Sequence, residues 1–320
     1  MPKNILILGG SGFVGRHVCA KLADQSLNMT VASRDIDSAK FLSPLPGVTL
    51  AQCDVHDEAA LTRLVAGHDA VVNLVAILHG NAASFEQVHV GLPAKLARAC
   101  AANGVRRLVH VSALGAGRDA PSLYLRSKAA GEQALRDGAL DLTLLRPSVI
   151  FGAEDRFLNL FATLQKLLPF VLLARAQTRF QPVWVEDVAQ AVVRCLLDGH
   201  DTIGLTYEAC GPDVYTLGKL VTQAGAWAGV NGGRGRPVFP LPDGLGRVQA
   251  TLMELTPGIP LMSRDNLDSM QVDSVATPGA PGLPALGIHA SALAAVAPGY
   301  LGQRGLRSGL TAMRRSAGRF

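Results

Sequence analysis

The stretch that most constrains the fold lies at residues 4–16, where a buried strand leads directly into closely spaced glycines. Ile5 to Leu8 form an unbroken apolar run, which predicts a strand covered on both faces. Gly9, Gly12 and Gly15 follow, and an amphipathic helix pattern begins among them. This order brings helix N–H groups and the positive end of the helix dipole close to a pyrophosphate. A glycine-rich surface turn is the alternative interpretation.

Apolar strands and helical segments alternate along the first half of the chain. This alternation predicts right-handed βαβ units and a parallel sheet with helices on both faces. In such a sheet a ligand binds where the carboxyl ends of the strands open at the switch in strand order. We therefore predict an α/β fold with a Rossmann-type, doubly wound parallel sheet. The predicted strands are 5–8, 29–33, 48–53, 70–78, 107–113 and 142–146, and the predicted helices are 36–41, 57–66, 85–103 and one that begins near Leu123.

The regular alternation breaks down beyond about residue 150. Residues 205–210 predict one more strand of the sheet, whereas 229–244 and 277–284 are rich in glycine and proline and predict loops. Helical pieces at 216–228 and 245–255 predict a smaller lobe that closes over the cleft and contacts the substrate. We assign 1–154 to an NAD(P)-binding Rossmann domain whose sheet is completed by 180–211, 155–179 and 212–303 to a smaller C-terminal substrate lobe, and 304–320 to a basic tail.

The chain is apolar on average but has no candidate membrane span. Its mean hydropathy is +0.25, yet no segment reaches the roughly 18 to 20 uninterrupted apolar residues that a spanning helix needs. The nearest candidate, 157–176, contains polar residues and Pro169, and predicts an amphipathic helix with a break. The apolar face of Phe157 to Leu173, which includes Phe161, Leu164 and Leu168, predicts a lipophilic pocket wall or a docking surface, with core packing as the alternative. No signal-peptide pattern precedes the first strand, so we expect a cytoplasmic protein.

Positive charge is concentrated at the C-terminal end. Subtracting the five arginines after residue 300 from the 30 basic residues leaves 25, which equals the 25 acidic residues. Such a tail predicts either peripheral contact with an anionic surface, such as the inner membrane face, or a merely solvated end. The five arginines are Arg304, Arg307, Arg314, Arg315 and Arg319.

Two further classes of site are not indicated. Basic stripes interleaved with aromatic residues are missing from the sequence, so we expect no nucleic-acid partner. The cysteines are odd in number and scattered without a Cys-x-x-Cys pair, which predicts small buried side chains rather than disulfides or a metal site. These cysteines are Cys19, Cys53, Cys100, Cys195 and Cys210.

The end of the second predicted strand favours NADP(H) over NAD(H). A carboxylate at that point would hold the ribose hydroxyls, whereas this chain has Arg34, which can hold a 2′-phosphate. Arg16 is a possible second cation. Asp54, after the third strand, is placed to accept a hydrogen bond from the adenine amine, with a helix N-cap role as the alternative.

A catalytic set is predicted at the end of the fifth strand and on the helix after it. Tyr124 and Lys128 are four residues apart and therefore share one helix face. An ammonium beside the phenol favours the phenolate and should lower the pKa of Tyr124 from about 10. Ser112, which ends the strand, could donate a hydrogen bond to the reacting oxygen. Together these groups predict proton transfer at a carbonyl or carbinol.

These motifs resemble the extended short-chain dehydrogenase/reductase superfamily, also called the NAD-dependent epimerase/dehydratase family. The features that match are the glycine pattern, Asp54-Val55, Val111-Ser112, Tyr124-x-x-x-Lys128 and the Arg-Pro-Ser-Val-Ile-Phe-Gly run of residues 146–152. The resemblance covers nearly the whole chain. The segments 146–157, 182–188, 207–212 and 297–301 resemble an atypical subgroup, which includes the nucleotide-binding accessory subunit of respiratory complex I and relatives linked to ubiquinone biosynthesis.

The resemblance implies a role for each matching residue. It assigns Ser112, Tyr124 and Lys128 to catalysis, Lys128 also to the nicotinamide ribose, and residues 147–150 to the wall behind the nicotinamide. The cofactor-binding residues that we predict are Gly9, Ser11, Gly12, Phe13, Val14, Gly15, Arg16, Arg34, Asp54, Val55, Leu74, Val75, Ala76, Lys128, Pro147 and Val149.

Two positions depart from the family pattern. Leu8 stands where typical members have Thr, and His89 stands where many have an Asn that organises a proton relay. His89 is therefore either a structural histidine or a catalytic one, and we favour the structural interpretation.

These features together favour an NADPH-dependent oxidoreductase that acts on a lipophilic carbonyl or quinone-related small molecule. The competing hypothesis is a protein that holds NADPH without turnover, as an assembly or structural partner of a respiratory or quinone-synthesising complex. A sugar-nucleotide epimerase is disfavoured, because residues 155–300 show no polar, arginine-rich lobe for a diphosphate apart from Arg156, Arg175, Arg179 and the loop at 234–247.

The assignment of Arg34 can be tested by nucleotide titration. NADPH should bind more tightly than NADH by about one charge-assisted contact, on the order of 1.5 to 3 kcal/mol. Arg34→Asp should abolish or invert this preference, because a carboxylate repels the 2′-phosphate. Calorimetry with both nucleotides measures the ratio, and equal affinities in the wild-type protein would contradict the assignment.

Overall fold

The first strand, β1 (Asn4–Leu8), is buried on both faces because its side chains alternate between two apolar layers. Ile5 and Ile7 pack with α1 (Phe13–Ala23) and α7 (Val185–Leu197). Leu6 and Leu8 pack with α2 (Glu58–Val65), α4 (Leu92–Ala102) and α5 (Leu123–Arg136). The computed structural model describes residues 2–254 and 262–302.

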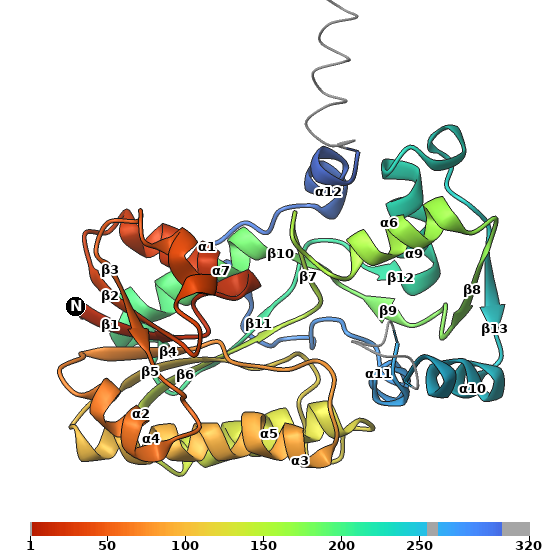
Figure 1. The fold of residues 1–320 in the computed structure, drawn as a ribbon. Helices are drawn as coiled ribbons and strands as arrows, with labels where there is room; N and C mark the ends of the chain where they lie inside the picture. The colour runs from red at the N-terminus through yellow and green to blue at the C-terminus, as the bar shows by residue number, and fades with distance from the viewer. Residues whose placement is uncertain (1, 255–261, 303–320) are drawn as a thin grey trace, which may run out of the picture.

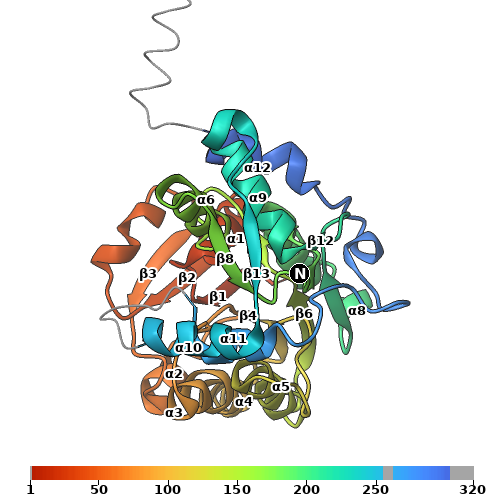
Figure 2. The ribbon, with the colours of Figure 1, turned by 90° about the vertical axis from the view of Figure 1, so that its right-hand side faces the viewer.

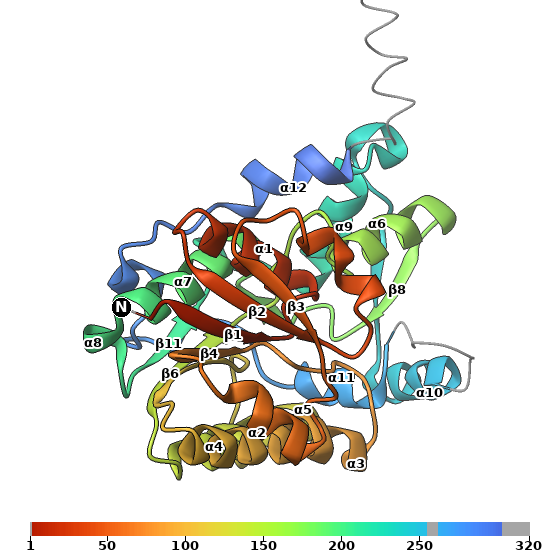
Figure 3. The ribbon, with the colours of Figure 1, turned by 60° about the vertical axis from the view of Figure 1, so that its left-hand side comes forward.

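Seven strands form the central sheet, and every neighbouring pair is parallel. The strand order is β3-β2-β1-β4-β5-β6-β11, so the order reverses between β1 and β4. Helices α1 and α7 cover one face, and α2, α4 and α5 cover the other (Figures 1 and 3). This arrangement confirms the doubly wound Rossmann-type sheet and the extra strand at 205–210. The strands are β2 (Asn28–Ser33), β3 (Val48–Gln52), β4 (Ala70–Asn73), β5 (Arg107–Val111), β6 (Asp141–Pro147) and β11 (Thr206–Ala209).

The fourth strand is shorter than predicted and ends at Asn73 rather than at residue 78. The Asn73 side chain ends the strand, because its Oδ1 accepts a hydrogen bond from the Val75 amide at 3.1 Å. Beyond this turn, the Ile77 amide donates to Nε2 of His89 at 3.1 Å. Residues 74–78 are therefore free to line the carboxyl edge of the sheet.

The helix predicted at 85–103 is interrupted by a π turn. The segment consists of α3 (Ala82–Phe85), a π turn at Glu86–Gly91, and α4. Helix α5 packs closely against the π turn, since a Cβ added at Gly131 would lie 1.9 Å from the carbonyl oxygen of His89. Only glycine at this position allows the two backbones to approach so closely.

The second lobe has its own core on the side of the molecule away from α1 and β3 (Figure 1). Phe157 and Phe161 stack edge to face within this core, with ring centroids 5.0 Å apart, so the core interpretation is correct for both. The loop predicted at 229–244 is wrong in part, because residues 238–241 form a strand that pairs with β8. The remaining elements are β7 (Ile150–Phe151), α6 (Leu158–Leu167), β8 (Val171–Ala174), β9 (Arg179–Phe180), β10 (Val183–Trp184), α8 (Gly199–Thr202), β12 (Tyr215–Thr216), α9 (Leu217–Trp227), β13 (Val238–Leu241), α10 (Asp243–Glu254), α11 (Arg264–Ser269) and α12 (Leu293–Leu301), with 3₁₀ turns at Asp37–Leu42, Val230–Gly233 and Leu283–Leu286.

No helix in the described part of the chain is long and apolar enough to cross a bilayer. The predicted basic tail at 304–320 lies outside the described residues, and the proposed domain boundaries remain predictions.

Candidate nucleotide and catalytic site

The glycine turn after β1 forms a close backbone cradle. Gly9 has a φ of +81°, and its carbonyl oxygen accepts a hydrogen bond from the Gly12 amide at 3.1 Å. A Cβ at Gly15 would lie 2.2 Å from the same carbonyl oxygen, so α1 can approach the turn only with glycine there. Helix α1 begins after Gly12 without a side-chain cap. Its first N–H groups are therefore suited to an anionic group, and the turn fits a dinucleotide pyrophosphate.

The two predicted cations differ in their surroundings. The Arg16 guanidinium lies over the Phe41 ring, 4.8 Å from its centroid, and 3.7 Å from a carboxylate oxygen of Glu154. Arg34 follows β2, is exposed, and forms no ion pair with any residue that the structure describes. Arg34 is therefore the more available of the two cations.

Asp54 does not cap the helix that follows it. Its Oδ1 accepts from the His56 amide at 3.0 Å, which makes a local turn after β3. Asp57 is the N-cap of α2 and accepts from the amides of Ala59 and Ala60. The N-cap interpretation of Asp54 is thus wrong, while its contact with adenine stays a prediction.

The remaining predicted cofactor segments lie at the same edge of the sheet. Leu74 to Ala76 follow β4, and a Cβ at Gly9 would lie 3.1 Å from the carbonyl carbon of Leu74. Pro147 ends β6, and its carbonyl oxygen accepts from the Leu114 amide at 2.9 Å. Val149 lies two residues further along the chain, and Val55 is buried beside Asp54. All these residues lie near the carboxyl ends of strands, where a parallel sheet binds its ligand.

Ser112 and Lys128 are brought together at the end of β5. The Lys128 side chain is 2% exposed, and its Nζ donates to the carbonyl oxygen of Val111 at 2.9 Å. Ser112 follows Val111, and its buried hydroxyl has no hydrogen-bond partner among the described residues. A buried hydroxyl without a hydrogen bond destabilises the folded protein, and a bound ligand could provide that hydrogen bond. Ser112 therefore fits a substrate-binding role. Tyr124 lies one helical turn before Lys128 on α5.

Burial rather than charge sets the protonation of the pair. Removal from water raises the pKa of Tyr124 to about 12 and lowers the pKa of Lys128 to about 8, although Glu132 opposes the second shift. The predicted lowering of the Tyr124 pKa is therefore wrong for this state of the protein. The phenol is protonated at neutral pH and can act as a proton donor.

His89 is a neutral structural histidine. Its Nε2 accepts from the Ile77 amide, and its Nδ1 lies 2.9 Å from Oγ of Ser127. The Ser127 hydroxyl donates its proton to the Tyr124 carbonyl oxygen, so Nδ1 of His89 must be the donor to Ser127. Burial, with Lys128 nearby, lowers the pKa of His89 to about 3. A catalytic role that needs a charged His89 is thereby excluded at neutral pH.

Sequence reasoning missed the aromatic packing around Tyr124. Phe85 stacks on His89 with centroids 5.4 Å apart, and both rings contact the Tyr124 ring edge to face. The four-residue spacing of Phe85 and His89 was the one available signal. The fully buried Glu132 carboxylate accepts two hydrogen bonds from Arg146 of β6. No pattern in the sequence indicated this ion pair.

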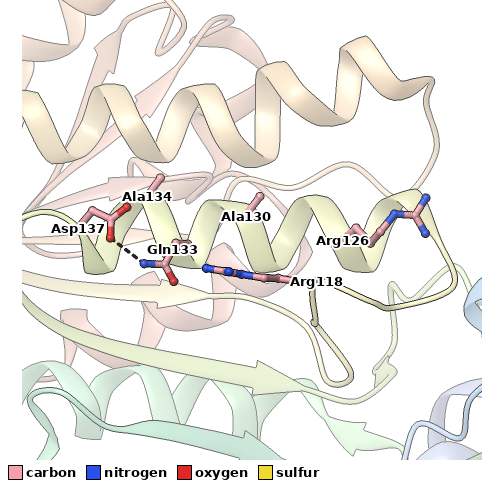
Figure 4. A pocket seen from close by; sticks show the side chains of 6 residues that line it. All are labelled: Arg118, Arg126, Ala130, Gln133, Ala134 and Asp137. Carbon is pink, nitrogen blue, oxygen red and sulfur yellow. Dashed lines mark hydrogen bonds between the residues drawn. The ribbon is translucent and has the colours of Figure 1, made fainter.

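A depression of about 440 Å³ on the outer side of α5 is separate from this site (Figure 4). None of the residues that line it is Ser112, Tyr124 or Lys128. The lining residues are Arg118, Arg126, Ala130, Gln133, Ala134 and Asp137.

Comparison with known proteins gives similarity over most of the chain. A family described as NAD(P)H-binding matches residues 9–199. The mitochondrial NADH dehydrogenase (ubiquinone) 1 alpha subcomplex subunit 9 of Mus musculus is 32% identical over 293 residues, which cover 90% of this chain and 76% of that protein. The protein of that name in Arabidopsis thaliana is 34% identical over 67% of this chain and 55% of its own length. A ceramide reductase of Caulobacter vibrioides is 29% identical over 59% of each chain.

Solved structures share the fold. An NADPH-dependent quinone oxidoreductase of Escherichia coli, solved with NADPH, has a TM-score of 0.75 at 20% identity and covers 93% of this chain and 100% of its own. A nucleoside-diphosphate-sugar epimerase of Staphylococcus aureus has a TM-score of 0.71 at 15% identity, with 94% and 100% covered. At these identities the likeness concerns the fold alone.

The neutral state of His89 predicts a specific dependence of stability on pH. Above pH 6.5 the side chain is uncharged in both the folded and the unfolded protein. As the pH falls towards about 3, only the unfolded state gains the proton, so the free energy of unfolding decreases. His89→Gln should remove up to about 1.4 kcal/mol per pH unit from this slope. Denaturant titrations between pH 4 and 7 measure it, and identical slopes in both proteins would contradict the assignment.

Proposed function

This chain belongs to the NAD(P)H-binding family, and its motifs resemble those of the extended short-chain dehydrogenases/reductases. We propose that it is an NADPH-dependent reductase of a lipophilic carbonyl or quinone-related compound. The observation that carries this proposal is the buried hydroxyl of Ser112, which has no partner within 2–254 and 262–302 and lies beside the backbone carbonyl that holds Lys128. A protein that merely holds a nucleotide has no need of such a hydroxyl. The relative named ceramide reductase supports a lipophilic substrate.

The side chains supply the proton and the orientation. Tyr124 is protonated at neutral pH and donates its hydroxyl proton to the substrate oxygen as that oxygen gains negative charge. Ser112 donates a hydrogen bond to the same oxygen and fixes its position. Lys128 stabilises the resulting phenolate through its ammonium group. When bound, NADPH supplies the hydride that converts the carbonyl to a carbinol, or the quinone to a hydroquinone.

We expect the nucleotide to be held by residues at the carboxyl edge of the sheet. The amides after Gly12 would hold the pyrophosphate, Arg34 the 2′-phosphate, and Lys128 the nicotinamide ribose. The exposure of Arg34 and its lack of an ion pair with the described residues support a preference for NADP(H).

An alternative function is supported by the mitochondrial relatives. Their names describe them as subunits of NADH dehydrogenase, which favours a protein that holds NADPH as part of a respiratory complex or a quinone-synthesising complex. In that case Ser112, Tyr124 and Lys128 would be present, but the protein would not turn over a substrate. The two functions differ in one measurable property, the dependence of hydride transfer on Tyr124.

A peripheral membrane contact is part of the proposal. The outer face of the second lobe exposes large apolar side chains on the C-terminal end of α6, on the β8–β13 pair and along α10, the elements that face the viewer in Figure 2. Lys166 and Arg234 lie on neighbouring segments and form no ion pair with the described residues. Apolar side chains with unpaired cations suit an anionic bilayer surface. The exposed residues are Leu167, Leu168, Phe170, Leu172, Phe239, Leu245, Val248 and Leu252.

Substitution of Tyr124 distinguishes a reductase from a protein that holds NADPH without turnover. Tyr124→Phe should slow single-turnover oxidation of bound NADPH by about 10²- to 10⁴-fold with little change in NADPH affinity, because only proton donation is lost. Lys128→Met should impair both properties. The substrates are short-chain quinones and aromatic or prenylated carbonyls, and Tyr215→Phe in the second lobe is the matched control. Turnover that is indifferent to Tyr124→Phe would contradict the assignment, and NADPH binding without any turnover would favour the holder.

The membrane contact predicts binding to anionic liposomes that weakens with salt. Leu167→Ser combined with Leu172→Ser should reduce co-sedimentation, because the apolar contribution is lost. Ile203→Ser with Leu205→Ser, two exposed residues near the start of β11, is the control and should bind as the wild type does. Deletion of residues 303–320 measures the separate contribution of the tail. Equal sedimentation of both double variants would rule out this surface.

A further inference from the structure

The first turn of α5 is completed by a carboxylate from the second lobe. Asp265 accepts hydrogen bonds from the amides of Leu123 at 2.6 Å and Tyr124 at 3.1 Å. Ser122 satisfies the next two amides of the helix, through its hydroxyl and its carbonyl oxygen. All four N-terminal N–H groups of α5 are thus bonded, and half of them depend on a residue more than 140 positions later in the chain.

Asp265 is held rigidly within its own lobe. It lies in α11, whose start is fixed by a reciprocal capping box between Ser263 and Asn266. Leu267 of the same helix is buried in a small core with Ala174 of β8 and Ala250 of α10. Figure 1 shows α11 beside the end of α5 at which Tyr124 lies. The carboxylate therefore moves with the lobe and not as a free side chain.

Tyr124 is consequently fixed from two sides. Its ring packs against Phe85 and His89, which belong to the segment after β4. Its backbone amide is bonded to Asp265 of the second lobe. A negative charge at the N-terminus of α5 also interacts favourably with the helix dipole. A displacement of α11 would therefore act directly on the residue that carries the phenol.

We propose that Asp265 is a positioning residue that couples the placement of the second lobe to the placement of Tyr124. The inference rests on the proposed proton-donor role of Tyr124. When α11 is seated on α5, the first turn of the helix is ordered and the phenol points at the reacting oxygen. When the contact is broken, two amides of that turn lose their partners and the phenol loses its fixed position.

Two measurements on the full-length protein with NADPH test the coupling without any substrate. Amide exchange in the first turn of α5 should rise about 5- to 30-fold in Asp265→Ala, the usual effect of losing a helix cap. The ring signal of Tyr124 in protein with ¹³C-labelled tyrosine, identified by its loss in Tyr124→Phe, should shift as the ring moves relative to Phe85 and His89. Asp268→Ala is the matched control, because that carboxylate binds Arg247 and Gln271 instead of α5.

Single-turnover kinetics distinguish positioning from simple stabilisation. Asp265→Ala should reduce the rate of hydride transfer roughly 10-fold or more with an unchanged Kd for NADPH. Asp265→Asn keeps one acceptor oxygen, so its rate should lie between those of the wild type and Asp265→Ala. An unchanged ring signal, or an exchange rate equal to that of Asp268→Ala, would overturn the inference. A wild-type rate of turnover in Asp265→Ala would overturn it as well. A wild type with no turnover contradicts only the proposed function, and the exchange and ring signals then decide the coupling.

Discussion

The close backbone approach at the glycine turn after β1 is the constraint on which the rest of this molecule depends. A side chain at Gly15 would collide with the carbonyl oxygen of Gly9, so α1 can pack against the sheet only without one. With α1 in place, the strand order reverses between β1 and β4 and the carboxyl ends of the strands meet at one edge. Every predicted nucleotide contact lies near that edge. The turn therefore determines both the architecture and the position of the ligand site.

Helix α5, which carries the proposed proton donor, is anchored by polar groups that are buried away from water. Lys128 is bonded to the end of β5, and Glu132, one turn later, is paired with Arg146 of β6. Buried charges are costly unless they are paired, so these contacts leave the helix few alternative positions. The same loss of water that makes these contacts specific also keeps Tyr124 protonated and brings the pKa of Lys128 to about 8. Burial is therefore the common cause of the fixed position of α5 and of the protonated state of Tyr124.

The enzyme and the holder make different demands on this arrangement. Both proposed functions share the nucleotide contacts that we propose for the glycine turn, Arg34 and Lys128. Hydride transfer to a substrate additionally requires Ser112, a protonated Tyr124 and a second lobe that holds the substrate. Two observed features are expected for hydride transfer and not for nucleotide binding alone. They are the Ser112 hydroxyl, which has no partner among the described residues, and the hydrogen bond between Asp265 and the Tyr124 amide. Their presence is the reason that we favour turnover, although the mitochondrial relatives at 32 and 34% identity are named as subunits of a complex.

The sequence by itself determined the alternation of strands and helices in the first half of the chain, the glycine turn, and the shared helix face of Tyr124 and Lys128, because local residue patterns encode all three. Tertiary structure decided the rest. The pKa of Tyr124 is raised, opposite to the prediction, because burial removes the phenol from water. The strand at 238–241 and the neutral state of His89 each arise from partners that are distant in the sequence or from burial. Asp265 left no trace in any pattern, since its contact with α5 joins segments more than 140 residues apart, and only folding brings them together.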